Sequence, residues 1–127
     1  MSDVKDPRLN YMVISGRLTR DPEKRHLGNS SLLTINLVHT ERYKKGDEWQ
    51  EKPVYIDVKV WGKSADYLAE KLTKGTIVLC QGRIFMDSWE NKEGKTVNKL
   101  VMSAHQVESM QWDKGASSKN EDDDMVF

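Results

Sequence analysis

Aromatic and basic side chains occur together at several points along the chain, and this pairing is the clearest chemical signal in the sequence. Lys44 and Lys45 follow Tyr43, and Trp89 stands in a polar stretch that also holds Lys92 and Lys95. Rings stack on exposed nucleobases, and lysines neutralise phosphates. The combination favours a single-stranded nucleic acid over a duplex, whose bases are hidden. A lone aromatic in a loop is often only a surface anchor, but repetition of the pair argues against that interpretation.

The segment 54–61 adds two more rings. It alternates strictly between apolar and other side chains, as a half-buried strand does. One face carries Val54, Ile56, Val58 and Val60, and the other carries Tyr55, Asp57, Lys59 and Trp61. If the apolar face lies in a core, both rings point outward. A subunit interface or a covering loop would explain exposed rings, and a platform for stacking bases would explain them too.

Charge is divided unevenly between the body and the end of the chain. The 127 residues include 20 Lys and Arg against 20 Asp and Glu, a formal net charge of zero. Residues 121–127 hold four of the acids and no base, so residues 1–120 carry 20 bases against 16 acids, or +4. Zero net charge therefore does not exclude a nucleic-acid partner, because a basic body is joined to an acidic tail.

The tail ends in apolar residues. The stretch before it, from Lys114 to Asn120, is small and polar, as flexible linkers are. We therefore divide the chain into a domain at 1–111, a linker at 112–120 and an acidic tip at 121–127. A solvated, disordered tail gains nothing from closing on an aromatic residue. We expect a disordered docking peptide, whose acids would meet a basic rim while Phe127 fills a pocket.

The pattern of hydrophobic residues predicts the elements that position these side chains. Alternation predicts five strands, at 11–19, 31–42, 54–61, 76–86 and 96–107. Turn residues predict a loop at 20–30 and exposed polar connections at 43–52 and 87–95.

A short helix is expected between the third and fourth strands. The apolar residues Ala65, Leu68, Ala69 and Leu72 recur at the spacing of one helix face. Ser64 is the expected N-cap, and Gly75 the expected stop. Five strands with one helix in this place form the element order of an all-β, Greek-key barrel of the OB type.

A series of short motifs runs along the chain in a distinctive order. They are residues 10–18 followed by TRDPE at 19–23, VWGK at 60–63, AEKLTKG at 69–75, QGR at 81–83 with Trp89 six residues on, and the terminal DDDMVF. In these motifs the chain resembles the bacterial-type single-stranded DNA-binding proteins, of bacterial or phage origin, over essentially its whole length. The resemblance implies an OB barrel that assembles as a homotetramer, wraps single-stranded DNA in the cytoplasm as a nucleoid-associated protein, and serves replication, recombination and repair.

The resemblance also assigns site residues. The family's stacking aromatics fall on Tyr43, Tyr55, Trp61 and Trp89, and two of its basic positions fall on Lys63 and Lys74. From local context we add further phosphate contacts, namely Lys44, Lys45, Lys59, Arg83, Lys92 and Lys95. The family's acidic tip recruits replication and repair proteins, and here it consists of Asp122, Asp123, Asp124, Met125, Val126 and Phe127. Asp57 departs from the pattern, because a base is more usual on that face.

The predicted strand at 76–86 is apolar on both faces. Val78, Cys80 and Ile84 share one side, and Ile77 and Leu79 share the other. The apolar side chains on each face must therefore be buried against another part of the protein or another subunit. A second subunit would cover one face and match the family's tetramer, and the helix or a loop is the alternative.

Other classes of protein have little support in the sequence. The single cysteine, Cys80, excludes an intramolecular disulfide, and the three histidines are scattered, so we expect no metal and no cofactor. Nucleotide-binding and catalytic motifs are absent, so we expect no enzyme. No apolar run approaches the roughly 18 residues of a membrane span, and no leader peptide is recognisable, so we expect a cytoplasmic protein.

Two rival functions remain from the sequence. The first is an oligomeric adaptor that acts mainly through its acidic tail, and the second is a nuclease built on an OB barrel. Deleting residues 121–127 separates the first from a DNA-binding protein, and incubating labelled DNA with Mg²⁺ or Ca²⁺ tests the second.

Overall fold

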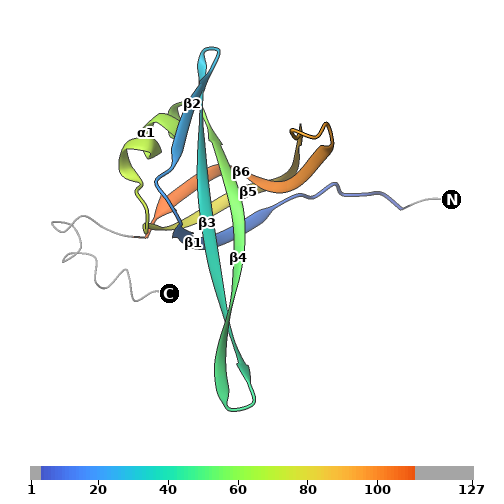
Figure 1. Cartoon of the computed structure of the whole chain (residues 1–127), viewed down its shortest axis with the longest axis vertical. Coiled ribbons are helices and arrows are strands. Elements are labelled where there is room, and N and C mark those ends of the chain that lie inside the picture. The colour runs from blue at the N-terminus through green and yellow to red at the C-terminus, as the bar shows by residue number, and fades with distance from the viewer. Residues whose placement is uncertain (1–3, 111–127) are drawn as a thin grey trace.

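The structure is a computed structural model, and it describes residues 4–110. The predicted linker and acidic tip lie outside the described residues. The elements, in chain order, are β1 (Met12–Leu18), β2 (Glu23–Leu27), β3 (Ser30–Lys45), β4 (Glu48–Trp61), α1 (Lys63–Lys71), β5 (Ile77–Glu90) and β6 (Thr96–Ser109) (Figure 1). In this part of the chain, no helix is long and apolar enough to cross a membrane.

Five of the strands close into a barrel. The sheet runs in the order β1-β5-β6-β4-β3-β2, and a further pairing of β1 with β3 closes the ring. That closing contact joins Arg17 to Val38 and Leu18 to Leu37. The β4–β6 pair is parallel, and the other pairs are antiparallel. The predicted all-β barrel of the OB type, with one short helix before β5, is confirmed.

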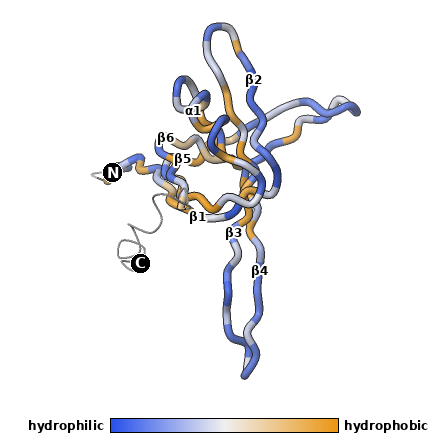
Figure 2. Tube along the Cα trace, turned by 90° about the vertical axis from the view of Figure 1, so that its left-hand side faces the viewer, coloured by the Kyte–Doolittle hydropathy of each residue, from blue (hydrophilic) through white to orange (hydrophobic). Residues whose placement is uncertain are grey.

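The core fills the barrel and the space under α1. Its fully buried side chains come from several strands and include Leu18, Leu33, Ile35, Leu37, Val58, Val78, Cys80 and Met102. Ala65, Leu68 and Leu72 close one end of the barrel with the predicted apolar face of the helix. Hydrophobic segments gather where the strands meet, whereas the far end of the β3–β4 hairpin is hydrophilic (Figure 2).

The predicted loop at 20–30 is wrong in part, because it contains β2. Residues of β2 pair with β3 from Glu23↔Thr34 to Leu27↔Ser30, around a turn at Gly28 and Asn29. All five residues of β2 are exposed, so hydrophobic alternation could not reveal the strand. Backbone pairing forms it, with an ion pair of 2.9 Å from Lys24 Nζ to Asp66 Oδ1 on α1.

The predicted polar connection at 43–52 is also mostly strand, and the one at 87–95 is strand over residues 87–90. β3 and β4 remain paired from Leu32↔Trp61 to Lys45↔Glu48, and the turn consists of Gly46 and Asp47. The two strands project far below the barrel as a twisted ribbon (Figure 1). Beyond the barrel neither face of this ribbon meets a core, so pairing continues without a hydrophobic pattern. Val54, expected in the core, is 40% exposed where the ribbon leaves the barrel.

The ends of the predicted helix are corrected too. Its N-cap is Gly62, with φ of 76° and no side-chain cap hydrogen bond, so Ser64 is not the cap. The helix ends at Lys71, where the Leu72 N–H donates to the Leu68 carbonyl oxygen over 2.9 Å. Gly75 lies beyond this end and donates its N–H to the Leu18 carbonyl oxygen over 2.9 Å. It therefore fastens the segment after the helix to β1 and does not end the helix.

Candidate nucleic-acid interface

β3, β4, β6 and β5 share an outer face, by which we mean the side opposite the barrel core. The register aligns outward side chains in a row across all four strands. Thr34 of β3 is paired with Lys59, Lys59 with Ser103 of β6, and Ser103 with Arg83 of β5. Two of the predicted phosphate contacts, Lys59 and Arg83, therefore lie on one surface.

Three of the four predicted stacking rings belong to this outer face. Tyr55 is 71% exposed, Trp61 48% and Trp89 45%. Tyr55 and Trp61 alternate with the core residues of β4, and Trp89 has the same parity along β5 as Arg83. The expectation that the rings of β4 point away from the core is confirmed.

Asp57 is held in a polar network between Tyr55 and Trp61. Lys99 Nζ donates to Asp57 Oδ2 over 2.8 Å, and Asn36 Nδ2 donates to Asp57 Oδ1 over 2.8 Å. Partial burial raises the pKa of Asp57, but the hydrogen bonds from Lys99 and Asn36 outweigh burial and hold the pKa below its usual value. The acid is therefore ionised at neutral pH, and it joins β6 to the outer face of β4.

A polar pocket of about 210 Å³ opens next to this network. Three cations line it, Arg20, Arg25 and Lys59, together with Thr34, Asn36, Leu32 and Glu23. Lys59 Nζ donates to Thr34 Oγ1 over 3.0 Å. Arg20, Arg25 and Lys99 were not predicted from the sequence. The two arginines lie in and before the unrecognised strand β2. Lys99 shares its parity in β6 with Val97 and Val101, so alternation alone gives no sign that it lies on the outer face.

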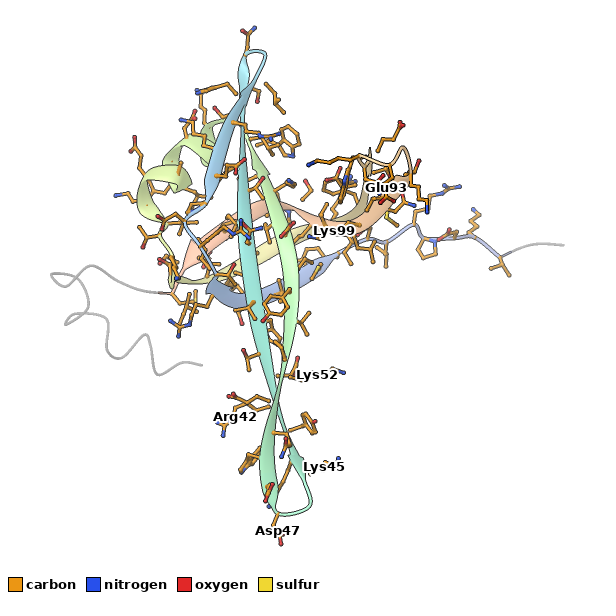
Figure 3. The ribbon with its side chains drawn as sticks, viewed as in Figure 1. Arg42, Lys45, Asp47, Lys52, Glu93 and Lys99 are labelled. Atoms are coloured by element: carbon orange, nitrogen blue, oxygen red, sulfur yellow. The ribbon has the colours of Figure 1, made fainter. Side chains whose placement is uncertain are left out.

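The other residues predicted for the ribbon lie on both of its sides. Lys44 is paired with Trp49 on the side that continues the outer face. Tyr43 and Lys45 have the opposite parity along β3, so the structure does not bring Tyr43 onto the face of Tyr55. Lys45 and Lys52 point away from the side taken by Arg42 (Figure 3).

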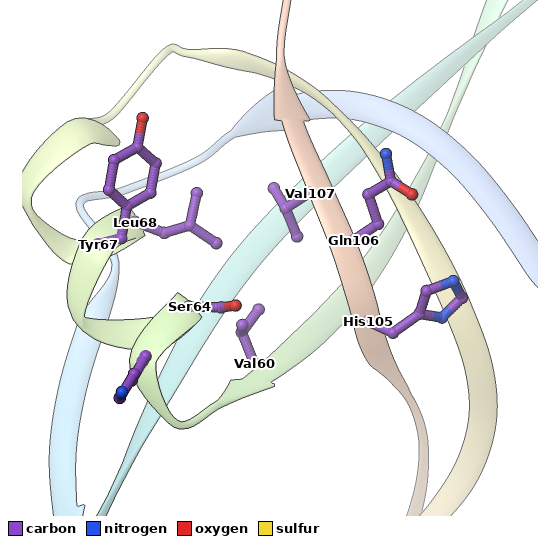
Figure 4. Close-up of a pocket in the computed structure, with 8 residues that line it drawn as sticks. Val60, Ser64, Tyr67, Leu68, His105, Gln106 and Val107 are labelled. Atoms are coloured by element: carbon purple, nitrogen blue, oxygen red, sulfur yellow. The ribbon is translucent and has the colours of Figure 1, made fainter.

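The remaining lysines lie around the edges. Lys63 begins α1 and lines a cavity of about 350 Å³ between the helix and β6 (Figure 4). Lys74 follows the helix, where its backbone N–H donates to Asp21 Oδ1 over 2.7 Å. Lys92 and Lys95 lie in the β5–β6 turn and are exposed. The predicted docking residues 122–127 lie outside the described residues.

The groups that could support catalysis are few in residues 4–110. In this range no cluster of three or more His, Cys, Asp or Glu side chains could hold a metal ion. Cys80 is fully buried, and burial raises the pKa of its thiol to about 12. A thiol with that pKa is not a nucleophile at neutral pH.

His39 stands where the ribbon leaves the barrel. Its Nδ1 lies 2.7 Å from the Ser15 carbonyl oxygen, and its Nε2 lies 2.8 Å from Glu41 Oε1. Both partners are acceptors, so only the doubly protonated ring donates to both of them. The Ser15 carbonyl and then Glu41 raise the pKa of His39 above its usual value.

We therefore predict a pH-dependent contribution of His39 to stability. A raised pKa in the folded state stabilises the fold fully below the unfolded pKa of about 6.5, and this contribution is lost as the pH rises through the folded pKa. The free energy of unfolding, measured in urea from pH 5 to 9, should differ most between the wild type and His39→Gln at the acidic end. A difference that widens with rising pH would contradict this assignment.

Residues 9–110 match the model of the single-strand binding protein family. A single-stranded DNA-binding protein of Aquifex aeolicus is 37% identical over 120 residues, covering 93% of this chain and 81% of the relative. One of Helicobacter hepaticus is 40% identical over 104 residues, and this match covers 80% of the chain but only 59% of that relative.

A solved structure gives an independent view of the fold. The crystal structure of a deletion mutant of the single-stranded DNA-binding protein from Thermus aquaticus superposes with a TM-score of 0.70 at 24% sequence identity. The match covers 81% of this chain and 51% of that one. At this identity the likeness concerns the fold alone. The family model and the relatives go further, and from them we conclude that the chain belongs to the single-strand binding protein family.

Proposed function

We propose that the chain binds and protects single-stranded DNA with little preference for sequence. The observation that carries the proposal is the outer face itself, where three exposed rings lie on one surface with Lys59 and Arg83. Unstacked bases would stack on the rings, and the cations would neutralise phosphates along the strand. The names of the relatives, which are single-stranded DNA-binding proteins, support the same proposal.

The remaining predicted contacts extend this path. Lys44 would contact DNA that continues from the outer face along the ribbon, whereas Tyr43 and Lys45 would contact DNA on the other side of the ribbon. Lys92 and Lys95 would contact DNA that follows the β5–β6 hairpin. Lys63 and Lys74 would meet phosphates that pass around the end of the barrel near α1. Because every base presents a ring face, such contacts tolerate any sequence.

The experiment that tests this proposal compares single strands with duplexes. Fluorescence anisotropy should show tight binding of a labelled oligo(dT) and much weaker binding of a labelled duplex of the same length. A duplex hides the faces of its bases, so only its phosphates remain to be bound. Equal affinity for both would reject ring stacking as the basis of binding.

We propose that the working form is a homotetramer. Val13 and Val54 are 49% and 40% exposed, and with the half-buried Leu79 they line an open cavity of about 460 Å³. Within residues 4–110, β1 pairs with β3 only at Arg17 and Leu18, so the rest of that edge of β1 has no strand beside it. Another subunit would cover both features. A monomer at micromolar concentration in sedimentation or mass photometry would contradict this proposal.

The acidic tip would recruit partner proteins of replication, recombination and repair. Deleting residues 121–127 should leave DNA binding intact or stronger, because four acids are removed, while binding of partner proteins is lost. The alternative function, an adaptor that works through its tail, predicts no DNA affinity in either form. We also propose that the chain is not a nuclease, so labelled DNA should remain uncut in Mg²⁺ or Ca²⁺.

Replacing Asp57 should strengthen DNA binding, whereas most substitutions on the outer face should weaken it. Asp57→Asn removes a negative charge from the outer face and releases Lys99 from its ion pair. Binding of oligo(dT) at low salt should become about 5-fold tighter, which is a change of about 1 kcal/mol. If Lys99 then contacts a phosphate, the slope of log K against log salt should steepen by about 0.7.

A matched variant controls for the change in net charge. Glu70→Gln removes one acid from the exposed side of α1 and should leave the affinity nearly unchanged. Lys99→Gln should lower the affinity more in the Asp57→Asn background than in the wild type. Weaker binding by Asp57→Asn, with unchanged stability, would contradict this account of the network.

A further inference from the structure

A ring and a guanidinium form a pair near the end of the β3–β4 ribbon. Trp49 is 60% exposed, and Arg42 Cζ lies 5.3 Å from the centroid of its ring. We propose that Trp49 and Arg42 form a further nucleotide site, in which a base of a single strand stacks on Trp49 while Arg42 meets the adjoining phosphate. This inference rests on the proposed function, because it lengthens the same DNA path.

The register places Trp49 in series with the rings of the barrel. Along one uninterrupted ladder, Trp49 is paired with Lys44, Tyr55 with Val38, and Trp61 with Leu32. The three rings therefore have the same parity on β4 at intervals of six residues. A strand advances about 3.3 Å per residue, so each interval spans about 20 Å. Trp49 continues the line of rings from the outer face onto the ribbon.

Packing does not account for Trp49. Trp49 belongs to the part of the ribbon beyond the barrel, which is hydrophilic (Figure 2), and most of the residues around it on β4 are exposed. It is not part of the core cluster. A large exposed aromatic with no apolar cover is informative, because it adds little to stability where it stands.

The surroundings of the ring suit a nucleotide. Arg42 supplies a cation beside the ring, and Lys44 is directly opposite Trp49 in the ladder. Arginine stacks on bases as well as binding phosphate, so the pair offers a ring, a planar cation and a second positive charge. Only unstacked bases can use the ring, so the ligand is a single strand.

The test is the dependence of affinity on the length of the DNA. Trp49→Leu and Arg42→Gln should match the wild type with short oligo(dT), which fills only the rings of the barrel. With oligomers long enough to reach the ribbon, Trp49→Leu should bind about 5- to 150-fold more weakly, the range found for loss of one stacked base. The affinity should therefore stop rising at a shorter length than in the wild type.

A second cation–π pair provides the control. On α1, Tyr67 is 62% exposed and Lys71 Nζ lies 5.7 Å from the centroid of its ring. This pair resembles the Trp49–Arg42 pair in exposure and chemistry but stands on the helix. Tyr67→Leu with Lys71→Gln should leave unchanged the length of oligo(dT) at which the affinity stops rising.

A direct signal comes from the full-length protein labelled with fluorotryptophan. The ¹⁹F line of Trp49, assigned by its absence in Trp49→Leu, should shift when long oligo(dT) is added and remain in place with short oligo(dT). Sedimentation of Trp49→Leu should match that of the wild type if the pair contacts DNA and not another subunit.

The outcomes separate this inference from the proposed function. If the wild type binds no oligo(dT) of any length, the proposed function fails. If the wild type binds but Trp49→Leu binds equally well at all lengths, or loses affinity equally at all lengths, this site is rejected and the proposed function stands. A changed oligomeric state with unchanged DNA affinity would assign the pair to a contact between copies, and would also reject the site.

Discussion

Replacing Tyr55 and Trp61 together by leucine is expected to weaken binding of oligo(dT) by at least about 30-fold. Each stacked base contributes about 1–3 kcal/mol by substitution, and two contributions at the lower limit amount to this factor. The two positions are six residues apart on β4, about 20 Å, so their effects should be nearly additive. Anisotropy with a labelled oligo(dT) at fixed salt measures the change.

The double variant needs two controls, which are its own stability and the loss of an exposed ring elsewhere on the protein. Both rings are exposed, so the double variant should unfold at nearly the same urea concentration as the wild type. Tyr67→Leu, which removes an exposed ring from α1, should bind oligo(dT) normally. Normal binding by a folded double variant would show that these two rings do not stack with bases.

Gly82→Ala should lower the free energy of unfolding by about 3 kcal/mol. Gly82 stands at a register shift between β5 and β6, where the two strands approach closely. A Cβ atom here would overlap the Ser103 carbonyl oxygen and lie 2.7 Å from Ala104 Cα. Both obstacles are backbone atoms, so the strands must separate, and overpacking of this kind costs typically 1–3 kcal/mol or more. Urea unfolding measures the loss.

Gly28→Ala is the matched control for that substitution. A Cβ atom at Gly28 would meet nothing within 4 Å, although the backbone has φ of 64°. A left-handed alanine costs roughly 1–2 kcal/mol with no steric overlap. Gly82→Ala should therefore be clearly the less stable of the two variants. A smaller loss at Gly82 than at Gly28 would contradict the close approach of β5 and β6.

The barrel could be predicted because its strands bury one face. Leu33, Ile35 and Leu37 alternate with Thr34 and Asn36, and the structure places the first three in the core. The same rule fails where neither face is buried. β2 and the far half of the ribbon are formed by backbone pairing without a buried apolar face, which leaves no hydrophobic pattern in the sequence.

The candidate site could be predicted only in part for a related reason. Parity alone places Tyr55, Lys59 and Trp61 on one face, because β4 also carries the core. The sequence does not show which faces of two strands become neighbours when the strands pair only in the folded protein. Asp57 and Lys99 form an ion pair but are 42 residues apart along the chain. The sequence therefore did not show that this acid on the outer face has a basic partner.

The most direct test of the account is a titration of the full-length protein with poly(dT) at two salt concentrations, followed by intrinsic tryptophan fluorescence. Stacking should quench the fluorescence, and the affinity should fall as salt rises, because bound phosphates release counterions. This result would establish rings and cations acting together on a single strand. Fluorescence that does not change when poly(dT) is added at low salt would contradict the central claim.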